Sequence, residues 1–309
     1  MKKGIIILGM LFSIASLFSQ QDAMFTHYSF NTMVVNPAYA GNRGMMSATL
    51  LQRNQWVGFD GAPVTQTFVL NTPIFNDKLG LGVSLIKDKI GPVNSFTGNL
   101  DLSYSFKLTK NQKLTFGLKG GASNYNRNLN NLFVDQEGDL SVNGATLNEI
   151  YANFGAGFLY TNKKFYLGAS IPKLLENTFE NPSATQGGVA SKEQMHYYIT
   201  AGSVFELNSN VELRPSTFVK ATAGAPIEID LTAMFAFNKK FEIGGMFRTT
   251  DAIGLLAGYV FQEKFRVGYS FDWSYGNETF TSNNGSHELM IRYDFLFKGN
   301  KQVLSPRYF

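Results

Sequence analysis

The stretch "KFRVGYSFDWSY", residues 264–275, places a large apolar side chain at every second position. One face carries Phe265, Val267, Tyr269, Phe271, Trp273 and Tyr275, and the other carries Arg266, Gly268, Ser270, Asp272 and Ser274. Successive side chains of a strand point to opposite faces, so this period of two predicts a β-strand. A soluble β-sandwich alternates in the same way, with one face in its core. The length of the pattern favours a membrane strand instead, because soluble strands average about five or six residues whereas a tilted membrane strand needs about nine to eleven.

The same alternation recurs along most of the chain, and it predicts an all-β fold of about fourteen strands. The expected strands cover residues 46–56, 63–72, 79–87, 95–108, 113–124, 149–161, 164–171, 195–207, 210–220, 226–237, 240–250, 252–261, 264–275 and 287–297. An even number of antiparallel strands can close on itself and leave no open edge in lipid. The pattern therefore predicts a transmembrane antiparallel β-barrel.

The connections between the expected strands differ in length at the two ends. After each even-numbered strand the turn is short, as in "FNDK", "TKNQK" and "NKK", whereas several connections after odd-numbered strands are long, as at 125–148, 172–194 and 276–286. Outer-membrane barrels have short periplasmic turns and longer extracellular loops. We therefore expect both chain termini and the Lys-rich turns to be periplasmic.

The bulk composition agrees with a membrane barrel and excludes several other classes. Aromatic residues make up 14% of the chain and charged residues only 16%, against about 25% charged in soluble domains. No apolar run of eighteen or more residues follows the start, which argues against helical membrane spans. There is no cysteine, so neither disulfides nor thiolate metal sites are expected. A mature net charge of about +2 gives no electrostatic reason to expect nucleic acid.

The chain begins with a pattern typical of a secretory signal peptide. Lys2 and Lys3 precede an apolar stretch from Ile5 to Phe18, and small or polar residues follow up to Gln20. A charged start, a short apolar core and small residues near the cleavage point are the features of an export signal. The expected organisation is a signal peptide at 1–20, a periplasmic or lumenal segment at 21–45, a barrel at 46–298 and a periplasmic tail at 299–309.

Aromatic and charged residues along the expected strands predict which faces meet lipid. Aromatic side chains flank most short turns, and rings of this kind form girdles at membrane interfaces. The expected girdle residues are Phe75, Phe106, Tyr160 with Phe165 and Tyr166, Phe237 with Phe241, and Phe261 with Phe265. The opposite faces carry charges that would cost several kcal/mol in lipid, and these should line the lumen and pair there. They are Asp101, Lys119, Glu228, Asp230, Arg248, Arg266, Asp272, Glu288, Arg292 and Asp294.

No residue pattern indicates an enzyme. The histidines are His27, His196 and His287, and none has the spacing of a metal-binding motif. A barrel enzyme could still assemble an Asp–His pair from distant strands, so this reading stays as a minor alternative. We expect no catalytic residue, no metal and no cofactor.

Two kinds of segment are candidates for binding. The apolar but turn-rich segment "FTHYSFNTMVVNPAYAGNRG", residues 25–44, needs burial, yet its irregular backbone cannot face lipid. It could fold into the periplasmic half of the lumen as a partial plug, with Asn36 to Gly41 inside, or serve as a periplasmic docking strip. The two longest loops carry apolar residues suited either to the barrel mouth or to a partner surface: Leu129, Leu132, Phe133, Leu174, Leu175 and Phe179.

Two blocks near the start resemble the PorP/SprF family of outer-membrane proteins of the type IX secretion system of Bacteroidetes. They are "FTHYSFNTMVVNPAYAGNRG" and "QRNQWVGFDGAPVTQTFVLNTPI", and the terminal "SPRYF" is also similar. The matching residues are Asn31, Asn36, Pro37, Ala38, Tyr39, Ala40, Gly41, Arg53, Gln55, Trp56, Gly61, Ala62, Pro63 and Thr65.

The resemblance implies a fourteen-stranded barrel with a non-enzymatic role in protein secretion and, for some members, gliding motility. SprF-like members serve large surface adhesins and recognise a C-terminal sorting domain of the cargo, whereas PorP-like members associate with periplasmic parts of the machinery. We favour a SprF-like adhesin partner in the outer membrane. The alternative from the residues alone is a passive or ligand-gated transporter, because a charged lumen in a barrel this large could hold a ligand.

Overall fold

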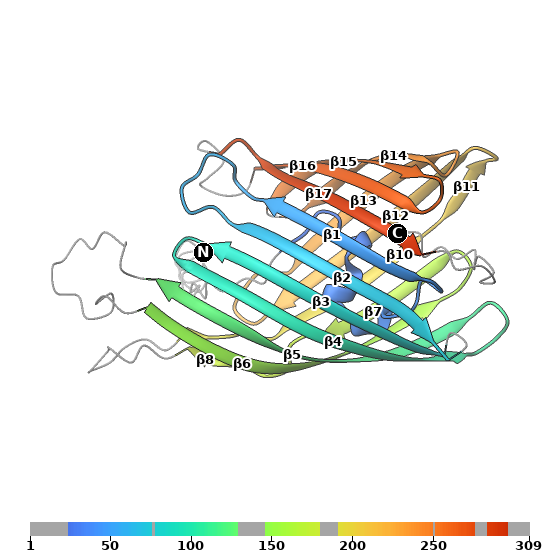
Figure 1. Cartoon of the computed structure of the whole chain (residues 1–309). Helices are drawn as coiled ribbons and strands as arrows, with labels where there is room; N and C mark the ends of the chain where they lie inside the picture. Colours follow the sequence, from blue (N-terminus) through green and yellow to red (C-terminus); the bar gives the residue numbers. More distant parts are fainter. Residues whose placement is uncertain are drawn as a thin grey trace, which may run out of the picture.

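The computed structural model is a closed antiparallel β-barrel of fourteen strands, which confirms the predicted fold (Figure 1). It describes residues 24–75, 78–128, 146–179, 191–249, 251–275 and 283–295. The expected signal peptide at 1–20, the tail at 299–309 and the loop residues Leu129, Leu132 and Phe133 lie outside these ranges.

The strands are β1 (Met46–Asn54), β2 (Val64–Ile74), β3 (Leu79–Ile90), β4 (Val93–Lys107), β5 (Lys113–Asn128), β6 (Thr146–Thr161), β7 (Phe165–Ile171), β8 (Thr178–Phe179), β9 (Ser191–Lys192), β10 (His196–Ser203), β11 (Phe205–Asn208), β12 (Val211–Thr222), β13 (Glu228–Phe237), β14 (Phe241–Arg248), β15 (Ala252–Phe261), β16 (Phe265–Ser274) and β17 (Ser286–Phe295). Strands β10 and β11 both pair with β12 and form one barrel strand interrupted at Val204. Strands β8 and β9 make a separate two-stranded hairpin.

Each barrel strand pairs with its neighbours in sequence, and the first and last strands close the ring. Met46 of β1 lies opposite Phe295 of β17, and the register continues to Asn54 opposite His287. On the other side of the ring, β7 pairs with β10 and β10 pairs with β12. Every barrel strand in the described part of the chain therefore pairs with a neighbour on both sides. The sheet closes on itself, as a membrane requires.

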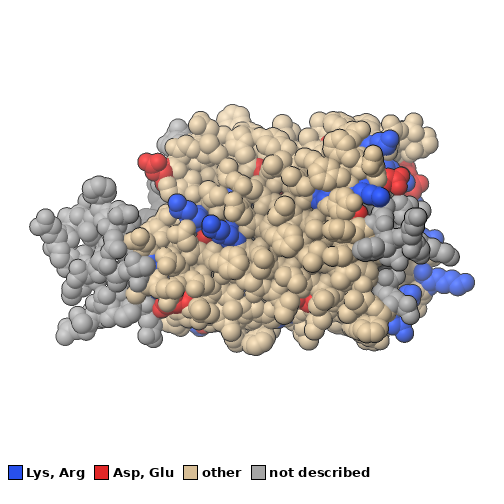
Figure 2. Space-filling view, in the orientation of Figure 1, with Lys and Arg blue, Asp and Glu red and all other residues tan. Residues whose placement is uncertain are grey.

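The stretch at residues 265–274 shows how the sequence pattern specifies the two faces of the wall. In β16, Arg266, Ser270 and Asp272 are buried towards the lumen, whereas Tyr269 and Trp273 are exposed on the outside. Apolar residues face outwards on other strands too, among them Leu100, Leu118 and Leu255. In the view of Figure 2, charged residues gather towards the two ends of the barrel and a broad uncharged surface lies between them. This arrangement is the one expected for a lipid-facing wall.

We call the two ends of the barrel the turn end and the loop end. The turn end carries the connections at 75–78, 108–112, 162–164, 209–210, 238–240 and 262–264. Two of these turns place paired non-glycine residues at positive φ, Asn238 with Lys239 and Gln262 with Glu263, which is the backbone of a tight hairpin turn whose twist matches the strands. The loop end holds the longer segments 55–63, 129–145, 172–195 and 275–285, together with short connections at 91–92 and 249–251.

One predicted girdle residue faces the lumen instead of the membrane. Phe75, Phe106, Phe237 and Phe261 are exposed near the turn end, as a girdle requires, but Tyr166 is buried. Tyr166 and its neighbour Phe165 lie on opposite faces of β7, so only one of them can meet lipid.

No helix in the described part of the chain is long and apolar enough to cross a membrane.

Candidate functional site

The lumen is occupied by the segment before the first strand, residues 24–45, which we call the plug. It folds into three short helical turns, η1 (Tyr28–Phe30), α2 (Thr32–Val35) and η2 (Pro37–Tyr39), visible in dark blue inside the ring of strands in Figure 1. Phe25, Tyr28, Met33 and Ala38 are all buried against the inner face of the wall. Irregular backbone is tolerated at membrane depth where protein surrounds it, and the plug meets this condition.

The plug runs along the lumen rather than occupying one half of it. Thr26 and His27 contact Glu288 and Asp272, which lie close to the loop-end termini of β17 and β16. Ala40 contacts Gly80 and Ser103, which lie near the turn end. The chain then enters β1 at Met46, also at the turn end. The plug therefore spans from the loop-end part of the lumen to the turn end.

At the loop end, a buried cluster of charges fixes the start of the plug. The Glu288 carboxylate accepts hydrogen bonds from the backbone amides of Thr26 and His27 at 2.9 and 2.7 Å. It also contacts the His27 Nδ1 atom at 2.8 Å. Arg53, one of the family-like residues, donates to Asp272 at 2.6 Å and to the Thr26 hydroxyl at 2.8 Å. The cluster holds because the buried charges are both paired and hydrogen-bonded.

Charged side chains of the wall also bind backbone carbonyl groups along the plug. Arg248 donates to the Phe25 carbonyl at 3.2 Å, Arg292 donates to the Phe30 carbonyl, and Lys119 donates to the Met33 carbonyl at 3.2 Å. Arg248 is at the same time paired with Asp230, and Lys119 with Asp101. These contacts satisfy carbonyl groups that would otherwise be buried without a partner.

Asn36 to Gly41 lie on a surface made by glycines of β3, β5, β6 and β7, which we call the glycine seat: Gly80, Gly117, Gly157 and Gly168. A Cβ atom at Gly117 would lie 2.2 Å from the Ala38 amide nitrogen, and one at Gly80 would lie 2.0 Å from the Ala40 carbonyl oxygen. A glycine inside a strand often marks such a close approach of another backbone. The seat thus admits this segment only because these positions lack side chains.

Three members of the Asn36–Gly41 block, Asn36, Pro37 and Gly41, have identifiable structural roles there. The Asn36 side chain accepts from the Ala38 amide at 2.9 Å and donates to the Phe158 carbonyl at 3.1 Å. Pro37 begins η2, where its fixed φ suits a helical start. Gly41 has a φ of +63° and packs against Gly80, a conformation that favours glycine.

Aromatic residues of the plug pack against those of the wall. Tyr28 stacks on Phe218 with ring centroids 4.9 Å apart, and its hydroxyl contacts Ser216 and Thr232. Burial raises the pKa of Tyr28 to about 12 and also raises the pKa of Tyr39, because the charged phenolate is disfavoured away from water. Asn31 donates to Thr67 at 3.2 Å.

Gln55, Trp56, Gly61, Ala62 and Pro63 lie together in the β1–β2 connection at the loop end, and Thr65 lies at the start of β2. The Gln55 amide donates to the Pro63 carbonyl, and the Gly61 carbonyl accepts from the Gly91 amide. Trp56 has a φ of +48° and donates from its amide and its indole to Ser286 and Ser274. The family-like residues therefore lie mainly in two places, the plug and the β1–β2 connection. Arg53 lies just inside the lumen from that connection, in the Glu288 cluster.

The described loop candidates lie at the loop end, outside the plug. Phe179 is buried in an aromatic cluster with Tyr125 and Tyr151, at ring-centroid distances of 5.0 Å each. Leu174 and Leu175 are exposed at 41% and 44%. One apolar loop residue thus packs against the barrel mouth, and two face outwards.

Sequence reasoning missed the glycine seat and the contacts of Thr26 and His27. Isolated glycines within strand patterns were a usable signal, although the patterns alone do not say what approaches them. His27 gave no signal, because its partner Glu288 lies 261 residues away. In the described part of the chain, no group of His, Cys, Asp and Glu side chains is arranged to hold a metal ion.

Comparison with known proteins gave one family and several barrels. The family model described as type IX secretion system membrane protein PorP/SprF matches residues 17–293. The CymD monoaromatic hydrocarbon channel is 11% identical, with 93% of this chain and 98% of that chain covered and a TM-score of 0.50. A Pseudomonas aeruginosa FadL homologue is 13% identical over 87% and 94% of the two chains, with a TM-score of 0.49. A search of curated proteins gave no match.

Proposed function

The chain belongs to the PorP/SprF family of type IX secretion system membrane proteins, and from this premise we propose that it is a non-enzymatic outer-membrane barrel that serves one secreted adhesin-like partner. In this proposal the barrel binds the C-terminal sorting domain of the partner, as a SprF-like member would. Secretion or surface anchoring of the partner depends on that binding, and gliding motility depends on the partner. Residues 1–20 would direct export, and the turn end would face the periplasm.

The filled lumen is the observation that carries this proposal. The plug is held by the Glu288 cluster, by Arg248, Arg292 and Lys119, and by the glycine seat. A barrel closed by so many directed contacts is poorly suited to passing solutes, so its work falls to its exposed surfaces. The loop end is the candidate surface for the cargo because it carries the longer connections and binding residues concentrate on loops held by a rigid scaffold.

Leu174 and Leu175 are the described residues that we assign to cargo contact. They are exposed, and they follow β7 directly beside the buried Phe179 cluster. The packed aromatic cluster beside the two leucines restrains this part of the loop. A partner can therefore bury their apolar area with little further loss of conformational entropy, which favours binding.

The test is surface display of the partner in a strain lacking this chain. Loss of display of one adhesin, restored by the wild-type chain and not by a Leu174→Glu/Leu175→Glu variant, is the expected result. Leu207→Glu is the matched control, because Leu207 is also exposed but lies at the turn end. Barrel levels in the outer membrane, and co-purification of the partner identified by mass spectrometry, accompany the assay. Normal display in the deletion strain would refute the proposal.

A further inference from the structure

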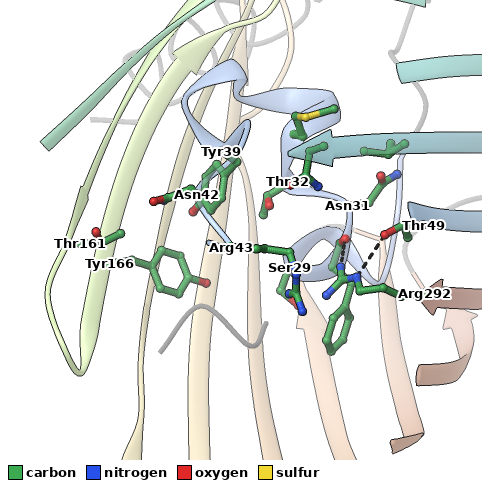
Figure 3. Close-up of a pocket in the computed structure, with 14 residues that line it drawn as sticks. Ser29, Asn31, Thr32, Tyr39, Asn42, Arg43, Thr49, Thr161, Tyr166 and Arg292 are labelled. Atoms are coloured by element: carbon green, nitrogen blue, oxygen red, sulfur yellow. Dashed lines mark hydrogen bonds between the residues drawn. The ribbon is translucent and has the colours of Figure 1, made fainter. Parts of the chain in front are cut away.

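The cavity between the plug and the wall is too small to hold a partner (Figure 3). Tyr39, Arg43 and Arg292 are among the residues that line it, and Arg292 already donates to the Thr49 hydroxyl at 3.1 Å. Its volume of about 40 Å³ admits only a few water molecules. Recognition of a partner therefore falls to the loops and the wall of the barrel.

In the wall, strand β6 extends well beyond its neighbour β7 at the loop end. Strand β6 pairs with β5 from one end to the other, whereas its ladder with β7 ends at Ala156 opposite Ile171. Residues 146–155 are thus paired in the sheet on one side only. Their other edge, which we call the open edge, borders the space beyond the end of β7.

The chain that follows β7 leaves the wall and runs over the inner face of β6. Odd-numbered residues of β6 face the lumen, as the buried Leu159 does. A Cβ atom at Gly155 would lie 2.3 Å from the Pro172 carbonyl oxygen, so the chain crosses the inner face at this point. The Asn153 side chain then binds both the amide and the carbonyl of Leu175, at 3.0 and 2.8 Å. These contacts hold the segment inside the mouth of the barrel and away from the open edge.

The open edge presents peptide groups without partners. The last contact across it joins the Leu174 amide to the Phe154 carbonyl at 2.7 Å. Peptide groups of a strand point to its two edges in turn, so every second residue shares the direction of Phe154. These residues are Ala152, Ile150 and Asn148, and in the described part of the chain their peptide groups have no hydrogen-bond partner on that edge. A row of free N–H and C=O groups is a template for another strand.

The outer face beside the open edge is apolar. Phe154 and Ile150 are 58% and 71% exposed, and Asn148 ends the apolar pattern towards the loop end. Across the gap, Tyr197 of β10 is also exposed. The open edge therefore starts at the level of the lipid-facing wall, where an unpaired peptide group is costly, so pairing of these groups is favoured.

The space beside the open edge is one strand wide. Strand β7 pairs with β6 on one side and with β10 on the other, so the position beyond Ile171 lies between the same two neighbours. Strand β10 begins at His196, just past its last pair with β7, Tyr198 opposite Ser170. Neighbouring strands lie about 4.8 Å apart, so a single extended segment fits. A strand of a second barrel carries its own neighbours on both sides and does not fit.

We propose that the open edge, at residues 148–152, binds an extended segment of the secreted partner by strand addition. This inference rests on the proposed function and adds the mode of recognition to it. Main-chain hydrogen bonds to Ala152, Ile150 and Asn148 supply affinity, and side-chain contacts supply specificity. The outward side chains of the segment are apolar, because they lie beside Ile150 and Phe154 and such cross-strand pairs are favourable.

The first test is hydrogen–deuterium exchange of the full chain in lipid nanodiscs. The probe is the full-length adhesin whose display is lost in the deletion strain, added in purified form. Mass spectrometry follows the fragment that covers residues 146–155. The amides of Ala152, Ile150 and Asn148 should exchange at least about tenfold more slowly when the adhesin is bound, because exchange requires their hydrogen bonds to open.

The second test removes one donor from the open edge. Ile150→Pro deletes an N–H group that does not belong to the ladder with β5, and proline is tolerated on a strand edge whose N–H groups are free. The variant should bind the adhesin at least about tenfold more weakly in biolayer interferometry. Ile150→Val keeps the N–H group and is the matched control, with unchanged binding expected. Heat-modifiable mobility in gel electrophoresis verifies that both barrels are folded.

Slower exchange on binding, together with weaker binding of Ile150→Pro and not of Ile150→Val, supports strand addition. If Ile150→Pro does not fold, the exchange of the wild-type chain decides alone. Normal display in the deletion strain refutes the proposed function and this inference together. Adhesin binding that leaves exchange at residues 146–155 unchanged, or that is equal for a folded Ile150→Pro and the wild type, overturns strand addition and leaves the proposed function standing. Protection that rises with barrel concentration in the absence of adhesin would assign the open edge to a second copy of this chain, and this outcome also overturns the proposal.

Discussion

Glu288 has no exposed surface, yet it accepts hydrogen bonds from two backbone amides of the plug and lies 3.4 Å from Arg53. A buried carboxylate of this kind adds little net stability over a well-packed apolar pair, but removing its charge takes a charged acceptor away from the backbone amides of the plug. The residue therefore specifies where the plug lies more than it stabilises the barrel.

Glu288→Gln should lower the free energy of unfolding by about 1–3 kcal/mol, because the backbone amides of Thr26 and His27 lose a charged acceptor, while Arg53 keeps Asp272 as its buried anion. The measurement is urea unfolding of the barrel in lipid vesicles, followed by tryptophan fluorescence. Glu206→Gln is the matched control, since Glu206 is exposed on β11 and surface changes of this kind stay within about 0.5 kcal/mol. Equal stability of the two variants would show that the Glu288 cluster does not hold the plug.

Gly117→Ala should displace the Asn36–Gly41 block from the glycine seat. The added Cβ would lie 2.2 Å from the Ala38 nitrogen and 2.3 Å from the Pro37 carbonyl carbon, and backbone atoms cannot give way as a side-chain tip can. We expect faster proteolytic cleavage of the plug and a lower unfolding temperature. Gly120→Ala on the same strand is the control, because its Cβ would meet only Phe154 at an ordinary 3.8 Å. Unchanged proteolysis of the Gly117→Ala variant would contradict the seat.

Single residues also mark where sequence reasoning stopped. The lumen-facing charges were predictable, since alternation places Arg266 and Asp272 on one face and the cost of charge in lipid identifies that face as the inner one. Their partners were not predictable: Arg53 meets Asp272 across 219 positions of the chain. Contacts of this range depend on barrel closure and register, which a local pattern does not specify.

At the scale of elements, the strands were predictable because their length and alternation satisfy one physical demand, an apolar outer face over the thickness of the membrane. The residues at which the strands begin and end were predicted less accurately. Predicted strand 79–87 extends to Ile90, and predicted strand 195–207 is interrupted at Val204. Burial of residues 25–44 in the lumen was one of two expectations, because irregular apolar backbone cannot face lipid. The conformation of the plug was not predictable, because its three short turns have no period and are shaped by the wall around them.

Leu100→Arg tests the assignment of the outer face. Leu100 lies in the middle of β4 and is 60% exposed, so an arginine there should cost about 2–4 kcal/mol in a lipid bilayer. Leu108→Arg is matched in chemistry but lies just beyond the turn-end terminus of β4, where the same change should cost about 0–1 kcal/mol. Urea unfolding in vesicles measures both. A similar cost at the two positions would contradict the proposed membrane depth of β4.

At the scale of the whole molecule, the barrel reverses the usual distribution of polarity, with apolar side chains outside and paired charges inside. A lumen lined in this way would hold water if it were empty. Here the plug takes the place of that water. Side chains of the wall form hydrogen bonds with the plug backbone at positions spread over most of the ring, on β17, β14, β4 and β7. We therefore expect the plug and the wall to unfold as one unit rather than to act as a channel with a removable gate.

The filled lumen predicts how the barrel conducts ions. The wild-type barrel should be electrically silent in planar bilayers, because the plug contacts the wall along the lumen. Deleting residues 22–41 should produce a steady open conductance, a loss of barrel stability, or both, since the glycine seat and the charged donors of Arg248, Arg292 and Lys119 would face water. The Gly117→Ala variant should fall between the two proteins, with brief openings, and Gly120→Ala should stay silent.

A wild-type barrel that conducts steadily would favour a transporter. A deletion variant that is both silent and as stable as the wild type would mean that the plug neither closes nor supports the barrel, and the segment would then be better explained as a docking strip for other secretion-system components.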